Sequence, residues 1–481
     1  MKRKDNDAKL RNAVPGDVME EYLAELKGQI RDRHAKEFVS EEIRNHIEEQ
    51  TEAYECEGMT HNEALAAAVR DMGDPVRVGA DMDKIHRPHM EWKFLVYVVL
   101  ISLLSLAVHY LIHTGADEVI RESAHAQSIV NPLLRGQVIG IVFGLVVMLA
   151  VYRLDYTVLL GRSRVIGGGY LVLLAVLSFA FGFRVNGSYM MLRIGTGAIS
   201  MRVLWLFYLP VFAGILYELR SKEKSHLLQI PVWMIAPLLS QWILGDLLIS
   251  FALFQLITET ALVCLAIWKG WYVISKKRIC YGLAGGFVSG IAGLIVAFRN
   301  MEAYRVQRLQ SWLGHLGIGN STPDPEGMDY INVRLQEVFA QSNMIGRSDP
   351  AAEIMSMMPG FRDDFILASI AAFFGKLAVA GILLAIGILA VYIFRISLRQ
   401  KNCLGYIVGC ACGIMIALQS IGNAMIVFGL LPLSSSTLPL FSHGTSYGIM
   451  NYALLGLILS IYRYKDIRVE KAVEYSEKAV L

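Results

Sequence analysis

Two adjacent carboxylates, Asp363 and Asp364, stand directly before a stretch of about thirty residues that carries only one charge. A charge buried in hydrocarbon is costly, so a carboxylate at such a boundary is expected at the membrane interface or in a water-filled cavity. A carboxylate that only begins a helix is also favourable, because it meets the positive end of the helix dipole. The residue types alone therefore leave two readings open, a solvated helix start and a functional carboxylate.

The segment before this pair, residues 299–363, contains six Arg but no Lys. Segments of this length between packed elements are usually functional or disordered, and its scattered aromatic residues argue against disorder. Guanidinium groups bind phosphate oxygens in a bidentate manner, which makes four of the arginines candidate anion ligands: Arg305, Arg308, Arg334 and Arg347. The alternative is that they pair with acidic residues of the same segment, such as Asp324, Glu326 and Glu337.

The elements that position these groups are membrane helices. Hydrophobic residues make up 54% of the chain and charged residues only 18%, below the level of about 25% that is typical of soluble domains. Runs of about 18 or more apolar residues are long enough to cross a bilayer. They predict an all-α, polytopic membrane protein with ten spans, near 93–112, 134–152, 165–183, 202–218, 228–245, 247–268, 280–298, 365–394, 404–431 and 445–462.

Positive charges predict the orientation of these spans, because cytoplasmic loops are enriched in Lys and Arg. Clusters of Lys and Arg recur in alternate loops, which places both termini in the cytoplasm and residues 299–364 outside. The predicted domains are a cytoplasmic helical domain over 1–91, a transmembrane domain over 92–465 and a cytoplasmic tail over 466–481.

The first 91 residues read as short helices with marked ends. Thr60 and Glu63 form a capping-box pattern, and Gly73 followed by Asp74-Pro75 predicts one helix end and the next helix start. The net charge of +3 and the absence of a basic stripe speak against nucleic-acid binding. The six cysteines show no Cys-x-x-Cys pair, and no metal site is predicted.

Two further charges fall inside predicted spans, Glu259 and Lys376. Both helices are predicted to run inward, so the two residues are expected at a similar depth. Because charges inside membranes usually pair or line a wet cavity, a contact between Glu259 and Lys376 is a hypothesis, and separate cavities or polar partners are the alternative.

Several motifs resemble those of the SEDS family (shape, elongation, division and sporulation). The segment Pro359-Gly-Phe-Arg-Asp-Asp-Phe-Ile-Leu-Ala368 resembles the family pattern Pro-Glu-x-His-Thr-Asp-Phe-Ile-Phe-Ala. The run from Gly429 to Ser446 resembles its Gly-Leu-Leu-Pro…Leu-Pro-Phe-Ile-Ser-Tyr-Gly-Gly-Ser-Ser, with His443 in place of Tyr. Further matches lie around Tyr304 to Trp312 and across 324–347. Residues 20–90 resemble the permease prefix domain, which implies a regulatory or partner-binding role.

The SEDS resemblance implies a peptidoglycan glycosyltransferase that polymerises lipid II on the outer face of the bacterial cytoplasmic membrane, working with a class B penicillin-binding protein. It implies Asp364 as the catalytic group, which would activate the acceptor sugar hydroxyl. No cofactor is firmly implied, and a divalent cation stays open. The implied substrate-binding residues are Arg305, Arg308, Tyr330, Arg347, Asn423, Ser442 and Gly444.

The sequence also departs from the family pattern. Ala372, Phe373, Phe374 and Gly375 stand where the family has Glu-Glu-Leu-Gly, and Ala198-Ile-Ser-Met201 where it has Gln-Pro-Ser-Glu. Two alternatives to the polymerase therefore remain, a non-catalytic scaffold of a cell-envelope complex and a transporter of lipid-linked precursors. His443 is read as a hydrogen-bonded loop residue rather than a catalyst.

Overall fold

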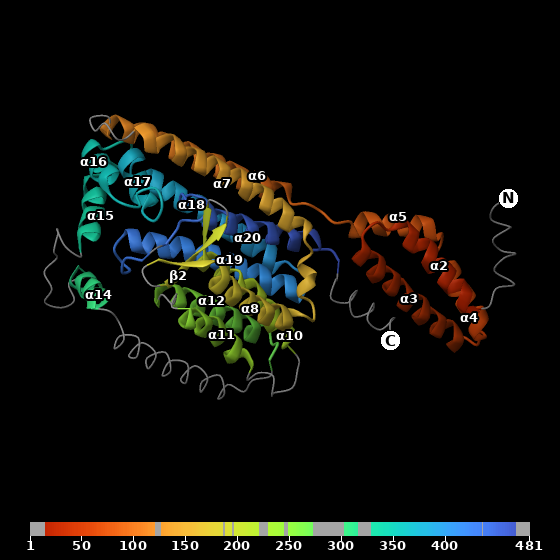
Figure 1. The fold of residues 1–481 in the computed structure, drawn as a ribbon. Helices are drawn as coiled ribbons and strands as arrows, with labels where there is room; N and C mark the ends of the chain where they lie inside the picture. The colour runs from red at the N-terminus through yellow and green to blue at the C-terminus, as the bar shows by residue number, and fades with distance from the viewer. Residues whose placement is uncertain are drawn as a thin grey trace. The chain divides into compact units, whose positions relative to one another are not determined.

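The computed structural model describes residues 15–120, 127–185, 188–194, 197–220, 229–244, 249–272, 303–315, 329–434 and 436–467. The chain divides into two compact units (Figure 1). Unit 1 combines Met1–Glu91, Arg399–Tyr406 and Leu459–Leu481, and unit 2 combines Trp92–Leu398 and Ile407–Ile458.

The described part of unit 1 contains four helices before the first span, and local signals mark their ends. They are α2 (Pro15–Gln29), α3 (Arg33–Cys56), α4 (His61–Asp71) and α5 (Pro75–His86). The Glu63 carboxylate accepts from the Thr60 backbone N–H at 3.4 Å, as in the predicted capping box. Gly73 has a φ of +82°, and the Asp74 carboxylate accepts from the Val76 N–H at 3.2 Å. The predicted helix starts and helix end in this region are therefore confirmed.

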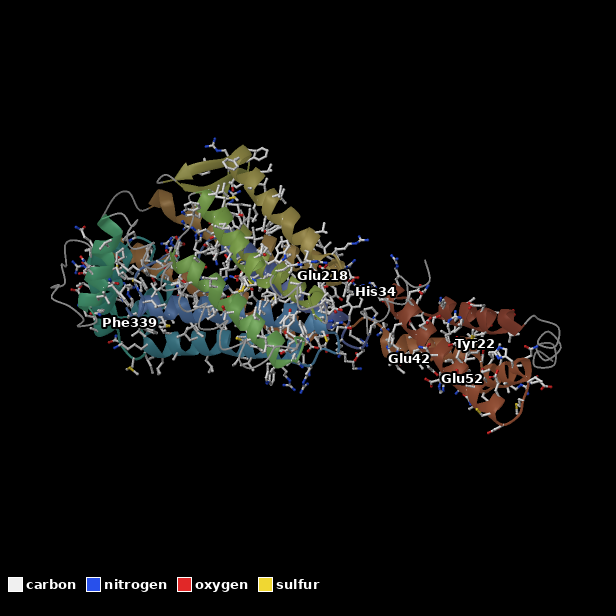
Figure 2. The ribbon with its side chains drawn as sticks, turned by 90° about the horizontal axis from the view of Figure 1, so that it is seen from below. Tyr22, His34, Glu42, Glu52, Glu218 and Phe339 are labelled. Atoms are coloured by element: carbon white, nitrogen blue, oxygen red, sulfur yellow. The ribbon has the colours of Figure 1, made fainter. Side chains whose placement is uncertain are left out.

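The core of unit 1 includes one face of α2. Tyr22, Leu23, Leu26 and Ile30 recur at helical spacing, and all four side chains are buried (Tyr22 is labelled in Figure 2). Unit 1 also takes in the end of the last helix. The His34 and Tyr464 rings meet edge to face with centroids 5.6 Å apart, and His86 Nδ1 lies 3.0 Å from the carbonyl oxygen of Asp466.

Unit 2 is built from long apolar helices, which confirms the predicted all-α polytopic fold. Among the described residues, seven helical segments are long and apolar enough to cross a membrane. They belong to α6 (Trp92–Ile120), α7 (Gln127–Arg153), α8 (Ser163–Phe181), α9 with α10 (Met201–Leu206, Tyr208–Glu218), α12 (Ile249–Trp268), α18 (Lys376–Leu398) and α19 (Cys403–Val427). Helices α11 (Gln229–Ile243) and α20 (Thr445–Arg463) lie at two further predicted spans. The span expected at 280–298 lies outside the described residues.

The eighth predicted span, 365–394, is wrong in its bounds. The chain forms a short helix α17 (Ile366–Phe374), breaks at Gly375 and begins α18 at Lys376. Gly375 has a φ of +95°, and a Cβ at this position would lie 2.7 Å from the Met344 carbonyl oxygen, so only glycine fits. The Lys376 N–H donates to the Asn343 carbonyl oxygen at 3.0 Å, which ties the start of α18 to the segment before α17.

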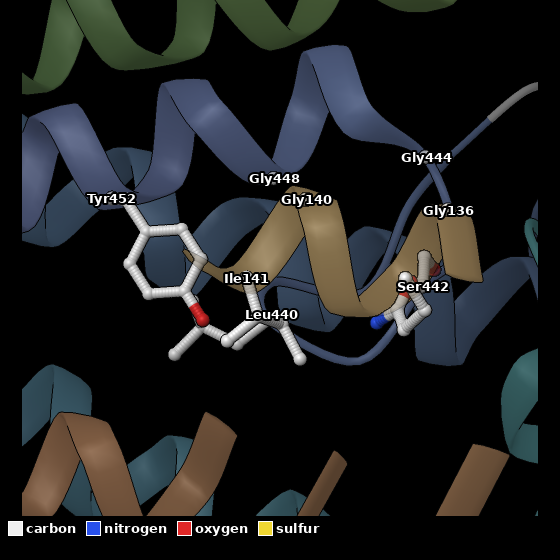
Figure 3. Close-up of a pocket in the computed structure, with 9 residues that line it drawn as sticks. Gly136, Gly140, Ile141, Leu440, Ser442, Gly444, Gly448 and Tyr452 are labelled. Carbon is white, nitrogen blue, oxygen red and sulfur yellow. The ribbon is translucent and has the colours of Figure 1, made fainter. Parts of the chain in front are cut away.

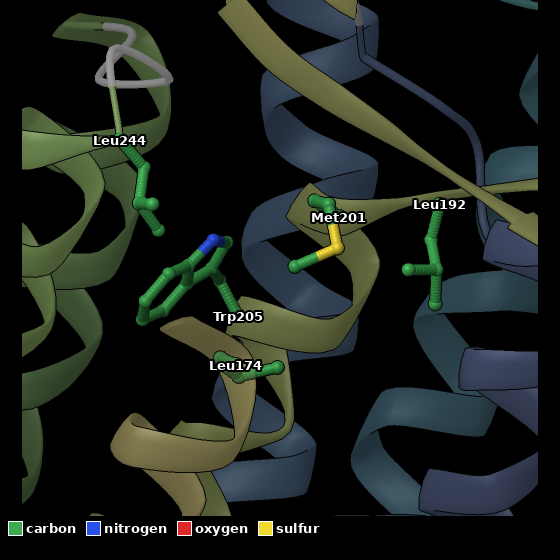
Figure 4. Packing of buried hydrophobic residues seen from close by; sticks show 5 residues of the cluster. All are labelled: Leu174, Leu192, Met201, Trp205 and Leu244. Atoms are coloured by element: carbon green, nitrogen blue, oxygen red, sulfur yellow. The ribbon is translucent and has the colours of Figure 1, made fainter. Parts of the chain in front are cut away.

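A small antiparallel sheet, which the sequence patterns did not predict, follows α8. Strands β1 (Gly182–Val185), β2 (Ser188–Ile194) and β3 (Gly197–Ser200) pair in that order. Leu192 of β2 packs with Leu174 of α8, with Met201 and Trp205 of α9 and with Leu244 (Figure 4). This apolar cluster fixes the sheet against the helices.

The described parts of the predicted outer segment are helical. Helices α14 (Ala303–His315), α15 (Tyr330–Gln341) and α16 (Asp349–Met357) lie toward one end of unit 2, on the left in Figure 1. The Trp312 indole N–H donates to the Gly429 carbonyl oxygen at 3.1 Å, and the Phe339 and Phe428 rings lie 5.1 Å apart. Aromatic contacts therefore hold α14 and α15 on the residues that follow α19.

Candidate active site

Asp364 lies in a tight turn between α16 and α17. Gly360 begins the turn with a φ of +75°, and its carbonyl oxygen accepts from the N–H groups of Asp363 and Phe365. The Asp363 side chain is 52% exposed, Asp364 is half-buried, and Phe365 and Ile366 are buried. Burial of the apolar residues on one side keeps the two carboxylates at the polar edge of the turn.

A second loop, residues 436–443, is hydrogen-bonded to the backbone of this turn. The Asn423 amide donates to the carbonyl oxygens of Asp364 at 2.8 Å and Ser436 at 2.7 Å. The Ser442 hydroxyl donates to the Asp363 carbonyl oxygen at 2.6 Å, and the His443 N–H donates to the Arg362 carbonyl oxygen at 2.9 Å. Three successive carbonyls are therefore held, and the structure brings Asp364, Asn423 and Ser442 together.

Histidines of α6 meet the same loop. His109, which is 5% exposed, places Nε2 at 2.6 Å from the Phe441 carbonyl oxygen. His113, one turn further along, lies 3.4 Å from an Arg362 guanidinium nitrogen through its Nδ1. His443 Nδ1 lies 3.3 Å from Asp363 Oδ1, so the loop and the turn also meet through side chains.

Gly444 lines a small cavity between α7 and α20 (Figure 3). Gly136 and Gly140 contribute from α7, and Gly448 and Tyr452 from α20. Ser442 lines the cavity as well, so one residue joins it to the Asp363 backbone. Three glycines on the facing helices, Gly136, Gly140 and Gly448, leave room for the cavity because they carry no side chains.

The predicted anion ligands have acidic neighbours where their side chains are described. Arg334 pairs with Glu337 at 2.7 Å, and this hydrogen bond raises the pKa of Arg334. Arg334 also lies over the Tyr330 ring, 5.4 Å from its centroid. Arg347 pairs with Asp349 at 3.0 Å and lies over the Phe373 ring. For Arg334, the alternative prediction that these arginines pair with acidic residues of the same segment is confirmed. Arg305 and Arg308 lie on α14, and their side chains lie outside the described part of the chain.

The predicted contact between Glu259 and Lys376 is wrong. Glu259 is fully buried and accepts from the Gln255 amide at 2.9 Å, while the Gln255 Oε1 accepts from Gln241 at 3.0 Å. The depth estimate assumed one unbroken helix from residue 365, and the break at Gly375 removes that premise. We call Gln241, Gln255 and Glu259 the buried polar row.

Sequence reasoning missed His109, His113 and Arg362 as neighbours of the turn. The signal was present, because two histidines four residues apart lie on one face of an apolar helix. Among the described residues, no group of three or more His, Cys, Asp or Glu side chains is placed to hold a metal ion.

Comparison with known proteins matches most of unit 2. The family model of the cell cycle proteins FtsW, RodA and SpoVE matches residues 91–467. The chain is 28% identical over 314 residues to a probable peptidoglycan glycosyltransferase FtsW of Pseudoalteromonas translucida, covering 62% of this chain and 71% of that protein. It is 26% identical over 396 residues to the corresponding protein of Enterococcus hirae, covering 79% and 92%.

Solved structures share the fold. A chain from a structure described as a peptidoglycan synthase complex that coordinates polymerization and crosslinking aligns with a TM-score of 0.60 at 19% identity, covering 78% of this chain and 99% of that one. The rod shape determining protein RodA of Thermus thermophilus aligns with a TM-score of 0.52 at 18% identity, covering 78% and 97%.

Proposed function

Because the chain belongs to the family of the cell cycle proteins FtsW, RodA and SpoVE, we propose that it is a peptidoglycan glycosyltransferase of the bacterial cytoplasmic membrane. It polymerises lipid II into glycan strands on the outer face of that membrane. Relatives that carry the name peptidoglycan glycosyltransferase support the reaction class, and they align with 62% and 79% of this chain.

The turn that carries Asp364 is the observation on which the assignment of the base rests. Its backbone is fixed by Asn423, Ser442 and the His443 N–H, while the Asp364 side chain stays half-buried at the polar edge. A fixed carboxylate within hydrogen-bond reach of a hydroxyl can take its proton in the transition state. The acceptor oxygen then bonds to the anomeric carbon of the donor sugar, and the bond from that carbon to the lipid diphosphate breaks.

The remaining predicted site residues bind the substrate in this proposal. Arg305, Arg308 and Arg347 take the diphosphate, and Tyr330 of α15 also contacts the substrate. Because Asp349 is 87% exposed, its pair with Arg347 is weak and a phosphate can replace it.

Asn423, Ser442 and Gly444 are the other substrate-binding residues in this proposal. The Asn423 amide and the Ser442 hydroxyl donate to the carbonyl oxygens of Asp364 and Asp363, which places both residues at the turn. Ser442 and Gly444 also line the cavity between α7 and α20.

Both termini lie in the cytoplasm in this proposal, and residues 299–364 lie outside. Residues 1–91, the basic loop with Arg399 and Lys401, and the end of α20 belong to one compact unit, which supports one common side for them. We assign residues 1–91 a regulatory or partner-binding role, residues 92–465 the polymerase and residues 466–481 the tail. The partner is a class B penicillin-binding protein, consistent with the synthase complex whose chain shares the fold.

Full-length protein in lipid nanodiscs, supplied with lipid II and the partner transpeptidase, should form glycan strands that are visible by gel electrophoresis. Asp364→Asn removes the base and should lower the rate by about 10²- to 10⁴-fold. Glu353→Gln is the matched control, because Glu353 is an exposed carboxylate on the neighbouring helix α16. Strand formation by Asp364→Asn at the wild-type rate would refute the assignment.

One observation favours a second candidate, a non-catalytic scaffold. Phe373, which stands where the family pattern has an acid, is buried, and Arg347 lies over its ring. A site that lost a carboxylate there lacks one polar partner. Complementation of a deletion strain by Asp364→Ala would support the scaffold, and its failure would support the polymerase.

A further inference from the structure

We propose that His443 is a positioning residue for Asp364, and that the Asp363–His443 pair fastens the catalytic turn more tightly when the imidazole is protonated. This inference rests on the proposed function. It adds a pH-dependent element that the family pattern lacks, since that pattern has Tyr at this position.

The pair joins the two loops beside Asp364. His443 Nδ1 lies 3.3 Å from Asp363 Oδ1, and the His443 N–H donates to the Arg362 carbonyl oxygen at 2.9 Å. His443 therefore contacts the turn through both its main chain and its ring. Asp363 precedes Asp364 directly, so a displacement of the Asp363 carboxylate moves the backbone on which Asp364 is carried.

The Nε2 end of the ring lies near Gly136 of α7. Nε2 of His443 lies 3.5 Å from the point where a Cβ on Gly136 would stand. Ser442 and Gly444, on either side of His443, both line the cavity between α7 and α20. The His443 side chain is 21% exposed, so a proton can reach the ring.

The charged surroundings favour a role for Asp363 as the counter-ion. The His109 ring lies edge-on to the His443 ring with centroids 6.3 Å apart, and Arg362 is the neighbour of His113. The titratable groups on the elements around His443 are Arg362, Asp363 and Asp364 in the turn, His109 and His113 on α6, Arg135 on α7 and Tyr447 on α20. Cationic or protonatable groups outnumber carboxylates here, and Asp363 is the carboxylate in contact with the His443 ring.

Protonation changes the strength of the pair without breaking its geometry. A neutral imidazole can donate Nδ1–H to Asp363, and a protonated one makes a charge-assisted hydrogen bond of about twice the strength. Histidine as a residue type changes its charge between about pH 5 and 8. The turn is therefore held firmly on the acid side of this range and less firmly on the alkaline side. Small misplacements of a catalytic group cost rate, so kcat should fall as pH rises.

The test is the pH profile of polymerisation by the full-length protein in nanodiscs with its partner, from about pH 5.5 to 9. Wild type should show an alkaline fall in kcat of about 3- to 10-fold with little change in KM, because the pair does not touch the substrate. His443→Tyr and Asp363→Asn should each lose this alkaline limb. The double variant should be no worse than either single variant, since both remove the same contact.

The exposed pair of His61 with Glu55 provides the control. His61→Tyr removes a comparable imidazole–carboxylate contact in unit 1 and should leave the alkaline limb in place. An alkaline limb that persists in His443→Tyr overturns the inference and leaves the proposed function intact. An active Asp364→Asn variant overturns the proposed function instead.

A readout that needs no turnover tests the pair directly. In protein labelled with ¹³C and ¹⁵N histidine, the His443 signal is identified by its loss in His443→Tyr. Its Nδ1 chemical shift should change in Asp363→Asn, because the carboxylate beside Nδ1 is gone. An Nδ1 signal that is the same in Asp363→Asn as in wild type overturns the inference whether or not the protein polymerises lipid II.

Discussion

Unit 2 carries carboxylates in two very different settings. In the turn at 360–365, neighbours hold the backbone and leave the side chain of Asp364 half-buried at the edge. In the buried polar row, a helix encloses the backbone of Glu259, and the side chain itself is held by Gln255. The first arrangement fixes a position from which a carboxylate can act on another molecule. The second satisfies one oxygen inside the bundle and leaves Glu259 Oε2 without a hydrogen-bond partner within the described residues.

The largest effect is expected when the charge of the buried Glu259 side chain is reversed. Glu259→Lys places a positive charge in a fully buried site beside the Gln255 amide donor and should destabilise the protein by about 3 kcal/mol. Glu259→Gln keeps the shape without charge and should retain both fold and polymerisation. Thermal unfolding in detergent, followed by size-exclusion chromatography, measures the difference. Loss of activity in a well-folded Glu259→Gln variant would show that the row takes part in turnover.

Asn423→Leu tests whether the backbone of the turn needs its support. The change removes two hydrogen bonds and leaves the carbonyl oxygens of Asp364 and Ser436 without this donor. Polymerisation should fall about 10- to 100-fold, because the base is displaced. Asn423→Asp is the companion variant, since it keeps the size but not the donor. Wild-type rates in both variants would mean that the loop does not position Asp364.

Arg334→Gln should have a small effect. The Arg334–Glu337 pair is exposed, and exposed pairs contribute about 0 to 1 kcal/mol. Arg334→Gln and Glu337→Gln should therefore change the KM for lipid II by less than about twofold. A selective rise in KM for Arg334→Gln would instead assign this arginine to the diphosphate.

The smallest effect is expected in unit 1, where a carboxylate sits in water. Arg44 donates to Glu20 at 2.7 Å, and this hydrogen bond lowers the pKa of Glu20. A folded-state pKa below the unfolded value stabilises the fold above the unfolded pKa, and that contribution is lost as pH falls through the folded one. Acidification below about pH 4.5 should therefore reduce hydrogen-exchange protection of α2 in the full-length protein. Arg44→Gln should weaken this dependence, and an unchanged profile would show that the pair is not formed.

The sequence predicted those structural features that depend on contacts between residues close together in the chain. The capping box at Thr60 and Glu63 and the helix end at Gly73 each need only a few neighbouring residues. The break at Gly375 was missed because it depends on Met344, thirty-one positions earlier in the numbering. The sheet was missed although Asn186-Gly187, a typical hairpin dipeptide, follows β1 in the sequence.

In the candidate active site, too, local signals were predicted and long-range contacts were missed. The family resemblance identified Asn423 and Ser442 as site residues. Their hydrogen-bond partners could not be predicted, because these are backbone carbonyl oxygens, which every residue has. His109 was missed because its partner is the Phe441 carbonyl oxygen, in a loop more than three hundred residues away.

The contact between His86 and the Asp466 carbonyl oxygen spans 380 positions of the sequence. At a synthesis rate of about 5 to 20 residues per second, the ribosome makes the second partner roughly 20 to 80 s after the first. Residues 1–91 therefore leave the ribosome first, but unit 1 is completed only when the last membrane helix has been made. Within that interval the surface that later receives Tyr464 is open to chaperones and proteases. A chain that stalls before α20 has been made keeps this surface open.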